Sequence, residues 1–353
     1  MAKKRLGRIP AIAAIAVVIM TAASACSIST SSAGGTKTGN AGSDSGTGQV
    51  GYSESFLTDP FQVQLVHQLA VDAKTQDVDL LPAVNANDDA GQQTTDVETL
   101  LGRGVKGLIV VPVDSKAISP AIQMANNDNV PVVTADLGAD QGKIFMIVRA
   151  NNVEMAQDVC QAMGKKLNGK GTVLNLQGDL ASQNGQDRSN GFTACMQKNY
   201  PGIKIISKPM NWDPTQCGTQ AQTVLSTTHI DGLFMASESV CLASVTKDLK
   251  SLNMLAPAGS PKHLVTMAID GTKPGMAAVR AGTLDLDVSQ PLNLYAQYAI
   301  YYIKAAMQGK TFKPGPDGHG GTIVKYGDSL MDLLPPTPVT TANANDKALW
   351  GNA

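Results

Sequence analysis

Residues 107–136 read GLIVVPVDSKAISPAIQMANNDNVPVVTAD. Two short apolar runs rich in β-branched residues, 107–111 and 130–134, flank a segment at 117–126 that we expect to be helical. A strand, a helix and a second strand in this order form a βαβ unit, whose two strands lie parallel in one sheet. This stretch therefore predicts an α/β fold.

The same alternation continues along the chain past residue 49. Strands are predicted at 49–53, 78–81, 107–111, 130–134, 144–148, 172–176, 203–206, 232–235, 265–268 and 285–288. Helices are predicted from Pro60, which follows an N-capping Asp59, and at about 90–103, 117–126, 153–167, 187–199, 215–227, 239–252, 273–281 and 294–308. These strands are more than one sheet of a compact domain usually holds, so two doubly wound lobes are predicted.

The composition of the 353-residue chain suits such a fold and excludes several classes of protein. Apolar residues make up 43% of the chain, which is enough to bury substantial cores, so a disordered chain and a small disulfide scaffold are excluded. Beyond four basic residues in the first eight positions, the chain has 24 basic against 29 acidic residues, a formal charge of −5. No basic field remains to bind a phosphate backbone, so no nucleic-acid partner is expected.

The first 25 residues have the three parts of a signal peptide. Basic residues precede an apolar run at 9–20, and small residues follow it. The run is shorter than the about 20 residues that span a bilayer, and a retained anchor helix is the alternative. Ala23-Ser24-Ala25-Cys26 resembles a bacterial lipobox, which predicts a lipid on Cys26, although Ala23 stands where Leu is commonest. Cleavage without lipidation is the other interpretation.

A low-complexity segment follows the signal peptide. Of the 22 residues 27–48, 16 are Ser, Thr or Gly, a composition that cannot offset its own ordering entropy. Residues 26–48 are therefore predicted to be a flexible linker. Gly46-Thr47-Gly48-Gln49-Val50-Gly51 matches the dinucleotide fingerprint by letters only, because its glycines precede a strand instead of following one.

Eight short motifs follow one another along the body of the chain. They are Thr58-Asp59-Pro60-Phe61, Val111-Pro112-Val113-Asp114-Ser115, Val130-Pro131-Val132-Val133-Thr134-Ala135-Asp136, Leu176-Gln177-Gly178, Asp187-Arg188-Ser189-Asn190-Gly191-Phe192, Trp212-Asp213, Ile269-Asp270-Gly271-Thr272 and Ser289-Gln290-Pro291. In this order and spacing they resemble the ribose/galactose-type periplasmic sugar-binding proteins of bacterial ABC importers, over about residues 49–325. The resemblance implies two Rossmann-like lobes joined by three hinge crossovers, near 150–152, 290–291 and Gly320.

The resemblance and the N-terminal pattern together imply a division of the chain and a function. The expected parts are a signal peptide at 1–25, a lipid-anchored linker at 26–48, a first lobe at 49–151 plus about 291–320, a second lobe at 152–290 plus about 321–340, and a tail at 341–353. The implied function is that of a monomeric lipoprotein on the extracytoplasmic face of the cell membrane. It would capture a sugar, deoxy sugar or polyol for an ABC permease. A receptor that reports a sugar or autoinducer to a membrane sensor, and a glycan-acting enzyme, are the alternatives.

The motifs lie at the carboxyl ends of strands, where open α/β sheets bind their ligands. A sugar site needs charged planar groups that make paired hydrogen bonds, and flat aromatic walls. The predicted ligand-binding residues are Asp59, Phe61, Asp136, Arg188, Trp212, Ser237, Asp270 and Gln290. Structural roles are open for several of them: Asp59 as a helix cap, Phe61 as a core residue, and Arg188 as a surface partner of Asp187 or Asp179.

Four residues at three places depart from the ribose-type pattern. Leu137 stands where that pattern has a second sugar-clamping Arg, Val111 stands where it has Asn, and Ser237-Glu238 replaces Asn-Asp. We therefore expect a less polar pocket on the first-lobe side, and a deoxy sugar, a polyol or another small neutral ligand is an alternative to ribose.

Four cysteines remain besides Cys26, an even number that favours disulfides in an exported chain. Cys217 and Cys241 lie in the opening turns of two helices expected on one face of the second lobe. Cys160 and Cys195 lie in the two helices that flank the strand at 172–176. The sequence alone permits three pairings of these four cysteines. The favoured pairs are Cys160–Cys195 and Cys217–Cys241, and free buried thiols are the alternative.

The sequence contains no recognised catalytic or metal-binding motif. Cys-x-x-Cys, His-Glu-x-x-His and Gly-x-Ser-x-Gly are absent. The four histidines, His67, His229, His263 and His319, are scattered without ligand spacing. We therefore predict no enzyme, no metal and no cofactor, although Asp136 and Asp270 could in principle act as a general acid and base.

Overall fold

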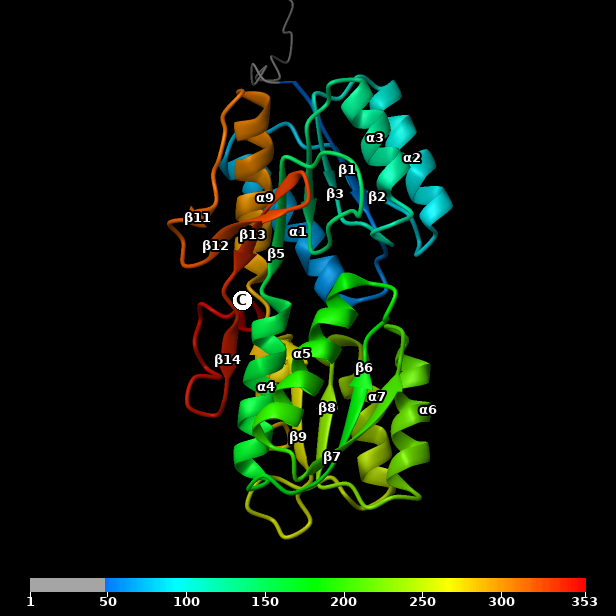
Figure 1. Cartoon of the computed structure of the whole chain (residues 1–353), viewed down its shortest axis with the longest axis vertical. Coiled ribbons are helices and arrows are strands. Elements are labelled where there is room, and N and C mark those ends of the chain that lie inside the picture. The colour runs from blue at the N-terminus through cyan, green and yellow to red at the C-terminus, as the bar shows by residue number, and fades with distance from the viewer. Residues whose placement is uncertain (1–47) are drawn as a thin grey trace, which may run out of the picture. The chain divides into compact units, whose positions relative to one another are not determined.

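The computed structural model describes residues 48–353, which form two α/β lobes, each built on one sheet (Figure 1). The predicted signal peptide, Cys26 and the linker up to residue 47 lie outside the described residues. Within residues 48–353, no helix is both long enough and apolar enough to cross a membrane.

The first-lobe sheet has eight strands in the order β11-β12-β13-β5-β4-β3-β1-β2. They are β1 (Val50–Glu54), β2 (Val84–Asn85), β3 (Gly107–Val110), β4 (Val132–Ala135), β5 (Met146–Ala150), β11 (Gly315–Pro316), β12 (Thr322–Tyr326) and β13 (Ser329–Leu334). Helices α1 (Pro60–Thr75) and α9 (Leu292–Met307) pack together on one face, and α2 (Ala90–Gly102) and α3 (Ser119–Asn127) pack on the other. The βαβ unit predicted at 107–136 is confirmed, since β3 and β4 pair in parallel with Leu108 opposite Val132.

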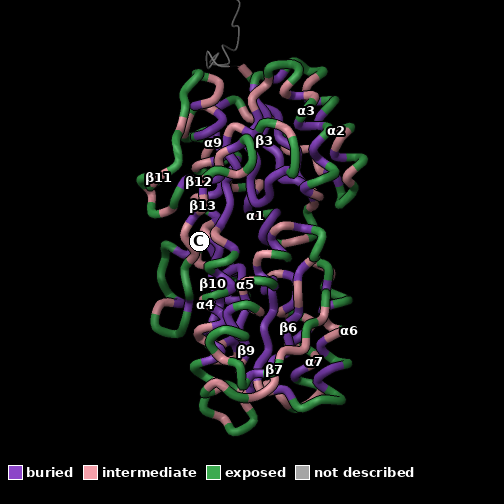
Figure 2. The backbone as a smooth tube through the Cα atoms, in the orientation of Figure 1, coloured by how far each residue is buried: buried purple, intermediate pink, exposed green. Residues whose placement is uncertain are grey.

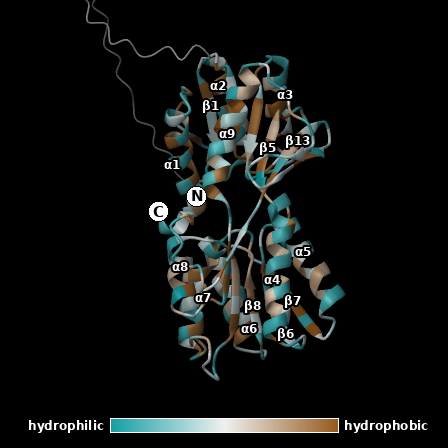
Figure 3. Cartoon of the chain, turned by 90° about the vertical axis from the view of Figure 1, so that its left-hand side faces the viewer, coloured by the Kyte–Doolittle hydropathy of each residue, from teal (hydrophilic) through white to brown (hydrophobic). Residues whose placement is uncertain are grey.

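The second-lobe sheet has six strands in the order β14-β10-β9-β8-β6-β7. They are β6 (Gly171–Gln177), β7 (Ile203–Pro209), β8 (Gly232–Met235), β9 (Val265–Asp270), β10 (Leu286–Ser289) and β14 (Thr337–Val339). The helices are α4 (Asn152–Lys166), α5 (Gln183–Asn199), α6 (Pro214–Leu225), α7 (Glu238–Ser251), α8 (Lys273–Arg280) and the short η1 (Trp350–Asn352). Helices α4 and α5 lie on one side of this sheet, and α7 and α8 lie on the other (Figure 3).

Burial follows the alternation of the sequence. Strands β3, β4, β5 and β8 are buried along their whole length (Figure 2). The helices turn apolar residues toward the sheets and polar residues outward (Figure 3). Removing these apolar faces from water is the main stabilising contribution to each lobe.

Two disulfides each join a pair of neighbouring helices in the second lobe. Cys160 on α4 is bonded to Cys195 on α5, with Cα atoms 6.2 Å apart. Cys217 on α6 is bonded to Cys241 on α7, with Cα atoms 5.6 Å apart. These are the pairs that the sequence favours, and each fixes the packing of two helices on one face of the sheet.

The chain crosses between the two sheets at three places: after β5, after β10 and after β13. The first two crossovers lie at the expected positions. The third does not lie near Gly320 but at Pro335-Pro336, because β12 and β13 form a hairpin whose second strand pairs with β5. Residues 322–334 were expected in the second lobe and belong to the first-lobe sheet, whereas β14 joins the second sheet beside β10.

Two smaller expectations are also wrong. The run at 78–81 makes only an isolated bridge from Leu80 to Val50, and strand β2 begins beyond Pro82, at Val84. The predicted tail at 341–353 is packed against the lobes, with Trp350 only 8% exposed.

Candidate ligand-binding site

A cavity of about 110 Å³ lies at the carboxyl ends of the strands of both sheets. All eight ligand-binding residues predicted from the sequence line it. The first lobe supplies Asp59, Phe61 and Asp136, the second lobe supplies Arg188, Trp212, Ser237 and Asp270, and Gln290 lies at a crossover. The cavity is smaller than the roughly 300–1,000 Å³ of pockets for drug-sized ligands, which suits a small molecule.

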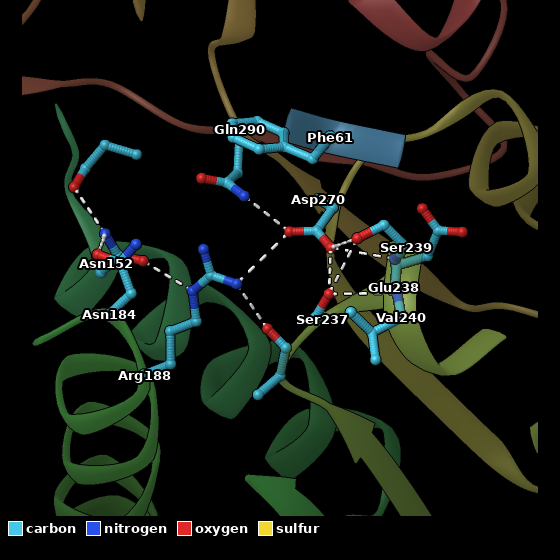
Figure 4. A network of polar contacts seen from close by, with 12 residues as sticks. Phe61, Asn152, Asn184, Arg188, Ser237, Glu238, Ser239, Val240, Asp270 and Gln290 are labelled. Atoms are coloured by element: carbon cyan, nitrogen blue, oxygen red, sulfur yellow. Dashed lines mark hydrogen bonds and ion pairs between the residues drawn. The ribbon is translucent and has the colours of Figure 1, made fainter. Parts of the chain in front are cut away.

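The buried carboxylate of Asp270, the last residue of β9, is the centre of the second-lobe wall (Figure 4). Its Oδ1 accepts hydrogen bonds from Gln290 Nε2 at 2.7 Å and from Arg188 Nη1 at 3.4 Å. Its Oδ2 accepts from Ser237 Oγ at 2.7 Å, and from the main-chain N and the Oγ of Ser239 at 3.0 and 2.8 Å. Protein donors therefore fix both oxygens, and the carboxylate is oriented in advance.

The guanidinium of Arg188, on α5, faces Asp270 and is also fixed by hydrogen bonds to two other protein acceptors. Its Nε donates to Asn152 Oδ1, and its Nη1 donates to the main-chain oxygen of Ala236, both at 2.7 Å. Only 3% of Arg188 is exposed. The alternative of a surface pair with Asp187 or Asp179 is therefore wrong, because the carboxylate that Arg188 pairs with is the buried Asp270.

Trp212 forms an aromatic wall next to this pair. The Arg188 guanidinium carbon lies 5.6 Å from the centroid of the indole ring, within the range of a cation–π interaction. The indole Nε1 donates to Ser182 Oγ at 3.3 Å, and the ring packs against Gly178, where any side chain would overlap it. Trp212 has a positive φ of 55°, a conformation that non-glycine residues rarely adopt and that often marks functional sites.

Phe61, in the first turn of α1, both lines the cavity and belongs to the core. Its ring makes edge contacts with Tyr295 and with Trp350, each with centroids 5.8 Å apart. Trp350 Nε1 in turn donates to the main-chain oxygen of Asp270 at 3.2 Å. The C-terminal segment thus supports both walls of the site, which no motif in the sequence indicates.

Asp136 follows β4 and is the acidic residue of the first-lobe wall. Its carboxylate accepts hydrogen bonds from Gln62 Nε2 at 3.0 Å and from Asn184 Nδ2 at 2.7 Å. Asn184 lies on α5, so this second bond connects the two lobes. Like Trp212, Asp136 has a positive φ, of 66°. Gln62 and Asn184 are not among the predicted residues, because amide side chains on helices carry no motif of their own.

Two predicted residues have a structural and a cavity-lining role at once. Asp59 caps α1, its Oδ1 accepting from Phe61 N at 3.0 Å, and Ser237 caps α7 by accepting from Val240 N at 3.3 Å. Both also line the cavity, where apolar groups of Pro112, Val113 and Leu137 contribute to the first-lobe side. Val111, which stands where the ribose-type pattern has Asn, is buried and does not line the cavity.

A second contact between the lobes lies beside the cavity. Arg149, on β5, is 3% exposed and forms an ion pair with Asp187 on α5 at 3.0 Å. The same guanidinium donates to Asn184 Oδ1. Arg149 therefore holds α5 of the second lobe against a strand of the first.

Residues 50–311 match the family described as the periplasmic binding protein domain. The chain belongs to this family. Membership implies an extracytoplasmic location, and the similar proteins given below are binding proteins, not enzymes.

Two curated proteins and one solved structure show the extent of the similarity. This periplasmic binding protein is 28% identical over 263 residues to the ribose import binding protein RbsB of Bacillus subtilis, covering 74% of this chain and 82% of that one. It is 27% identical over 201 residues to the xylitol-binding protein of Mycolicibacterium smegmatis, covering 56% of this chain and 55% of that one. An ABC transporter periplasmic solute binding protein from Actinobacillus succinogenes with bound D-allose superposes with a TM-score of 0.74 at 20% identity, covering 85% and 99% of the two chains. The last likeness confirms the two-lobed α/β fold.

Several buried or half-buried carboxyl groups around the site have raised pKa values. Burial raises the pKa of Glu54, the last residue of β1, to about 8, although hydrogen bonds from Tyr52 and Ser55 oppose the shift. Burial also raises the pKa values of Asp59 and Glu238 to about 7, and the nearby charge of Asp270 adds to both shifts. The folded protein therefore holds protons that the unfolded chain has already released at neutral pH.

We predict that the protein becomes less stable as the pH rises from about 5 to about 8. In this range the folded state binds more protons than the unfolded state, so the free energy of unfolding falls by up to about 1.4 kcal/mol per pH unit for each such group. Glu54→Gln should flatten this slope in urea unfolding curves recorded across the range. Glu98→Gln, on the exposed side of α2, should leave the slope as it is. Equal slopes for Glu54→Gln and the parent would contradict the prediction.

Proposed function

We propose that this protein captures one small neutral polyhydroxylated molecule, a sugar, deoxy sugar or polyol, and presents it to an ABC import permease. The observation that carries the proposal is the convergence of Arg188, Asp270 and Trp212 from one lobe with Asp136 and Phe61 from the other on a single small cavity. Hydroxyl groups both donate and accept hydrogen bonds, so they match a lining that offers carboxylates and a guanidinium together.

The charges of the lining favour a neutral ligand over an anionic one. Five aspartates and one arginine line the cavity: Asp59, Asp88, Asp136, Asp179, Asp270 and Arg188. The arginine is already paired with Asp270. A phosphate or carboxylate on the ligand would therefore be repelled by the aspartates that Arg188 does not pair with, whereas ligand hydroxyl groups can donate to them.

Arg188 is the residue with the clearest capacity to donate to a ligand. Its Nε and Nη1 bind protein acceptors, whereas its Nη2 has no hydrogen-bond acceptor among residues 48–353. A ligand hydroxyl placed beside Nη2 would also lie near the Trp212 ring, which can pack against the apolar C–H face of a sugar.

A ligand that contacts both lobes would bias them toward a closed arrangement about the three crossovers. Closure needs contacts that differ between the open and closed forms, and a ligand bound to one lobe alone would not shift that equilibrium. We propose that the protein acts as a monomer and that the permease recognises its closed form.

We further propose that the chain is anchored to the membrane by a lipid on Cys26. The basic, apolar and small-residue parts of residues 1–26 support this step. Cys26→Ser should move the protein from the membrane fraction to the soluble fraction, and mass spectrometry of the parent should find an acylated Cys26. A soluble parent that begins at another residue would contradict it.

The binding site can be tested by calorimetry with the ligand that a thermal-shift panel of pentoses, hexoses, deoxy sugars and polyols identifies. Arg188→Ala and Asp270→Ala should each weaken binding by about 2–5 kcal/mol, because buried partners are left unpaired. Trp212→Ala should cost about 1–3 kcal/mol through lost apolar contact. Sugar phosphates should not bind.

Two variants control for indirect effects. Arg103→Ala removes an exposed arginine and should leave binding as it is. Arg188→Lys keeps the charge but not the planar fork, so it should bind weakly while remaining folded by circular dichroism. Binding within about threefold of the parent by both Arg188→Ala and Asp270→Ala, under about 0.7 kcal/mol, would refute the site.

A further inference from the structure

A cluster of two carboxylates and one imidazole lies in the first lobe, and none of its members lines the ligand cavity. Asp317 and His319 lie in the loop between β11 and β12, and Asp332 lies on β13. His319 Nε2 is 3.0 Å from Asp317 Oδ2 and 2.9 Å from Asp332 Oδ2. One ligand atom from each of the three residues lies within 4.8 Å of the other two.

This spacing is close to that of a metal site. Zinc binds His nitrogen and Asp oxygen at about 2.0–2.2 Å, so neighbouring ligand atoms of a tetrahedral site lie about 3.3 Å apart. The two distances from His319 Nε2 to the carboxylate oxygens, 3.0 and 2.9 Å, are only a few tenths of an ångström shorter than this.

Burial and charge favour the binding of a cation by this cluster. The side chains of Asp317 and Asp332 are 0% exposed, and that of His319 is 9% exposed. Even a protonated His319 would balance only one of the two carboxylates, and buried charge is costly unless it is paired. Among the described residues, Asp332 Oδ1 accepts no hydrogen bond. A divalent cation with a neutral imidazole would balance the cluster completely.

The three side chains are also held in place by their neighbours, as metal ligands usually are. Asp317 Oδ1 accepts from the main-chain N of His319 and of Gly321, at 2.8 and 2.9 Å, which leaves its Oδ2 directed at the imidazole. The Tyr298 ring stacks on His319 with centroids 3.4 Å apart and an angle of 15° between the planes. Tyr302 OH donates to Asp332 Oδ2 at 2.9 Å.

We propose that Asp317, His319 and Asp332 bind one divalent transition-metal cation, best matched by Zn²⁺. An imidazole with two carboxylates suits Zn²⁺, whereas Ca²⁺ takes six to eight oxygen ligands and Mg²⁺ keeps an octahedral shell of oxygens. A water molecule or the Tyr302 hydroxyl would complete the coordination. The ion would fasten the β11–β12 loop to β13 and α9. The sequence does not indicate this metal site, because the hairpin pairing that sets Asp332 opposite Ile323 is needed to bring Asp332 to His319.

Zinc titration of the untagged protein, stripped with a chelator, tests this site. Isothermal calorimetry should show one saturable Zn²⁺ site, and the melting temperature should rise when Zn²⁺ is added. His319→Ala and Asp317→Asn should each weaken Zn²⁺ binding at least tenfold. His229→Ala, which removes an exposed histidine beside Asp231, should bind as the parent does.

A Co²⁺ titration provides a readout that folding alone does not change, because d–d absorption bands report the ligand field of the bound ion. These bands should appear with the parent and with His229→Ala, and should be lost in Asp317→Asn, which keeps the size of the side chain. Excess Mg²⁺ or Ca²⁺ should not displace the ion. No saturable Zn²⁺ binding by the parent, or equal affinity in His319→Ala and Asp317→Asn, would overturn the proposal.

Discussion

The carboxylate of Asp270 is the interaction on which the second-lobe half of the cavity depends. It accepts hydrogen bonds from Gln290, Arg188, Ser237 and Ser239 at once, and so connects β9, a crossover, α5 and the start of α7. Its main-chain oxygen accepts a further bond from the Trp350 indole of the C-terminal segment. A buried carboxylate is tolerated only when donors surround it, and these donors are the groups that shape the cavity.

The first-lobe half is joined to the same network through Tyr295, a buried residue of α9. Its hydroxyl accepts from Ala150 N at 2.7 Å, and its single proton can be donated either to Gln290 Oε1 at 3.2 Å or to Asp136 Oδ1 at 3.4 Å. Ala150 and Gln290 lie at two of the crossovers, so the polar groups of the site are tied to the segments about which the lobes would move. Direct contacts between the lobes, such as the ion pair of Arg149 with Asp187, would stabilise the closed arrangement together with any ligand.

Short segments of the sequence predicted those elements of the structure that nearby residues determine. Short segments are enough for the βαβ pattern of residues 107–136 and for the Asp59-Pro60 helix start, whereas the cavity-lining positions at strand ends came from the resemblance of eight motifs to sugar-binding proteins. Features that depend on distant pairing could not be predicted in this way. The hairpin of β12 and β13 joins the first sheet because Met331 pairs with Ile147, and Trp350 reaches the cavity wall from the end of the chain. The same pairing assembles the cluster of Asp317, His319 and Asp332, whose spacing in the sequence matches no metal motif.

The central claim is that one ligand is held by side chains of both lobes. A crystal structure of the complex with the ligand selected by the panel tests it most directly. The account predicts ligand hydroxyl groups within hydrogen-bond distance of Arg188 on one side and Asp136 or Asp59 on the other, with the Trp212 ring against a C–H face. A ligand that touches only one lobe, or that lies outside the cavity, would contradict the account.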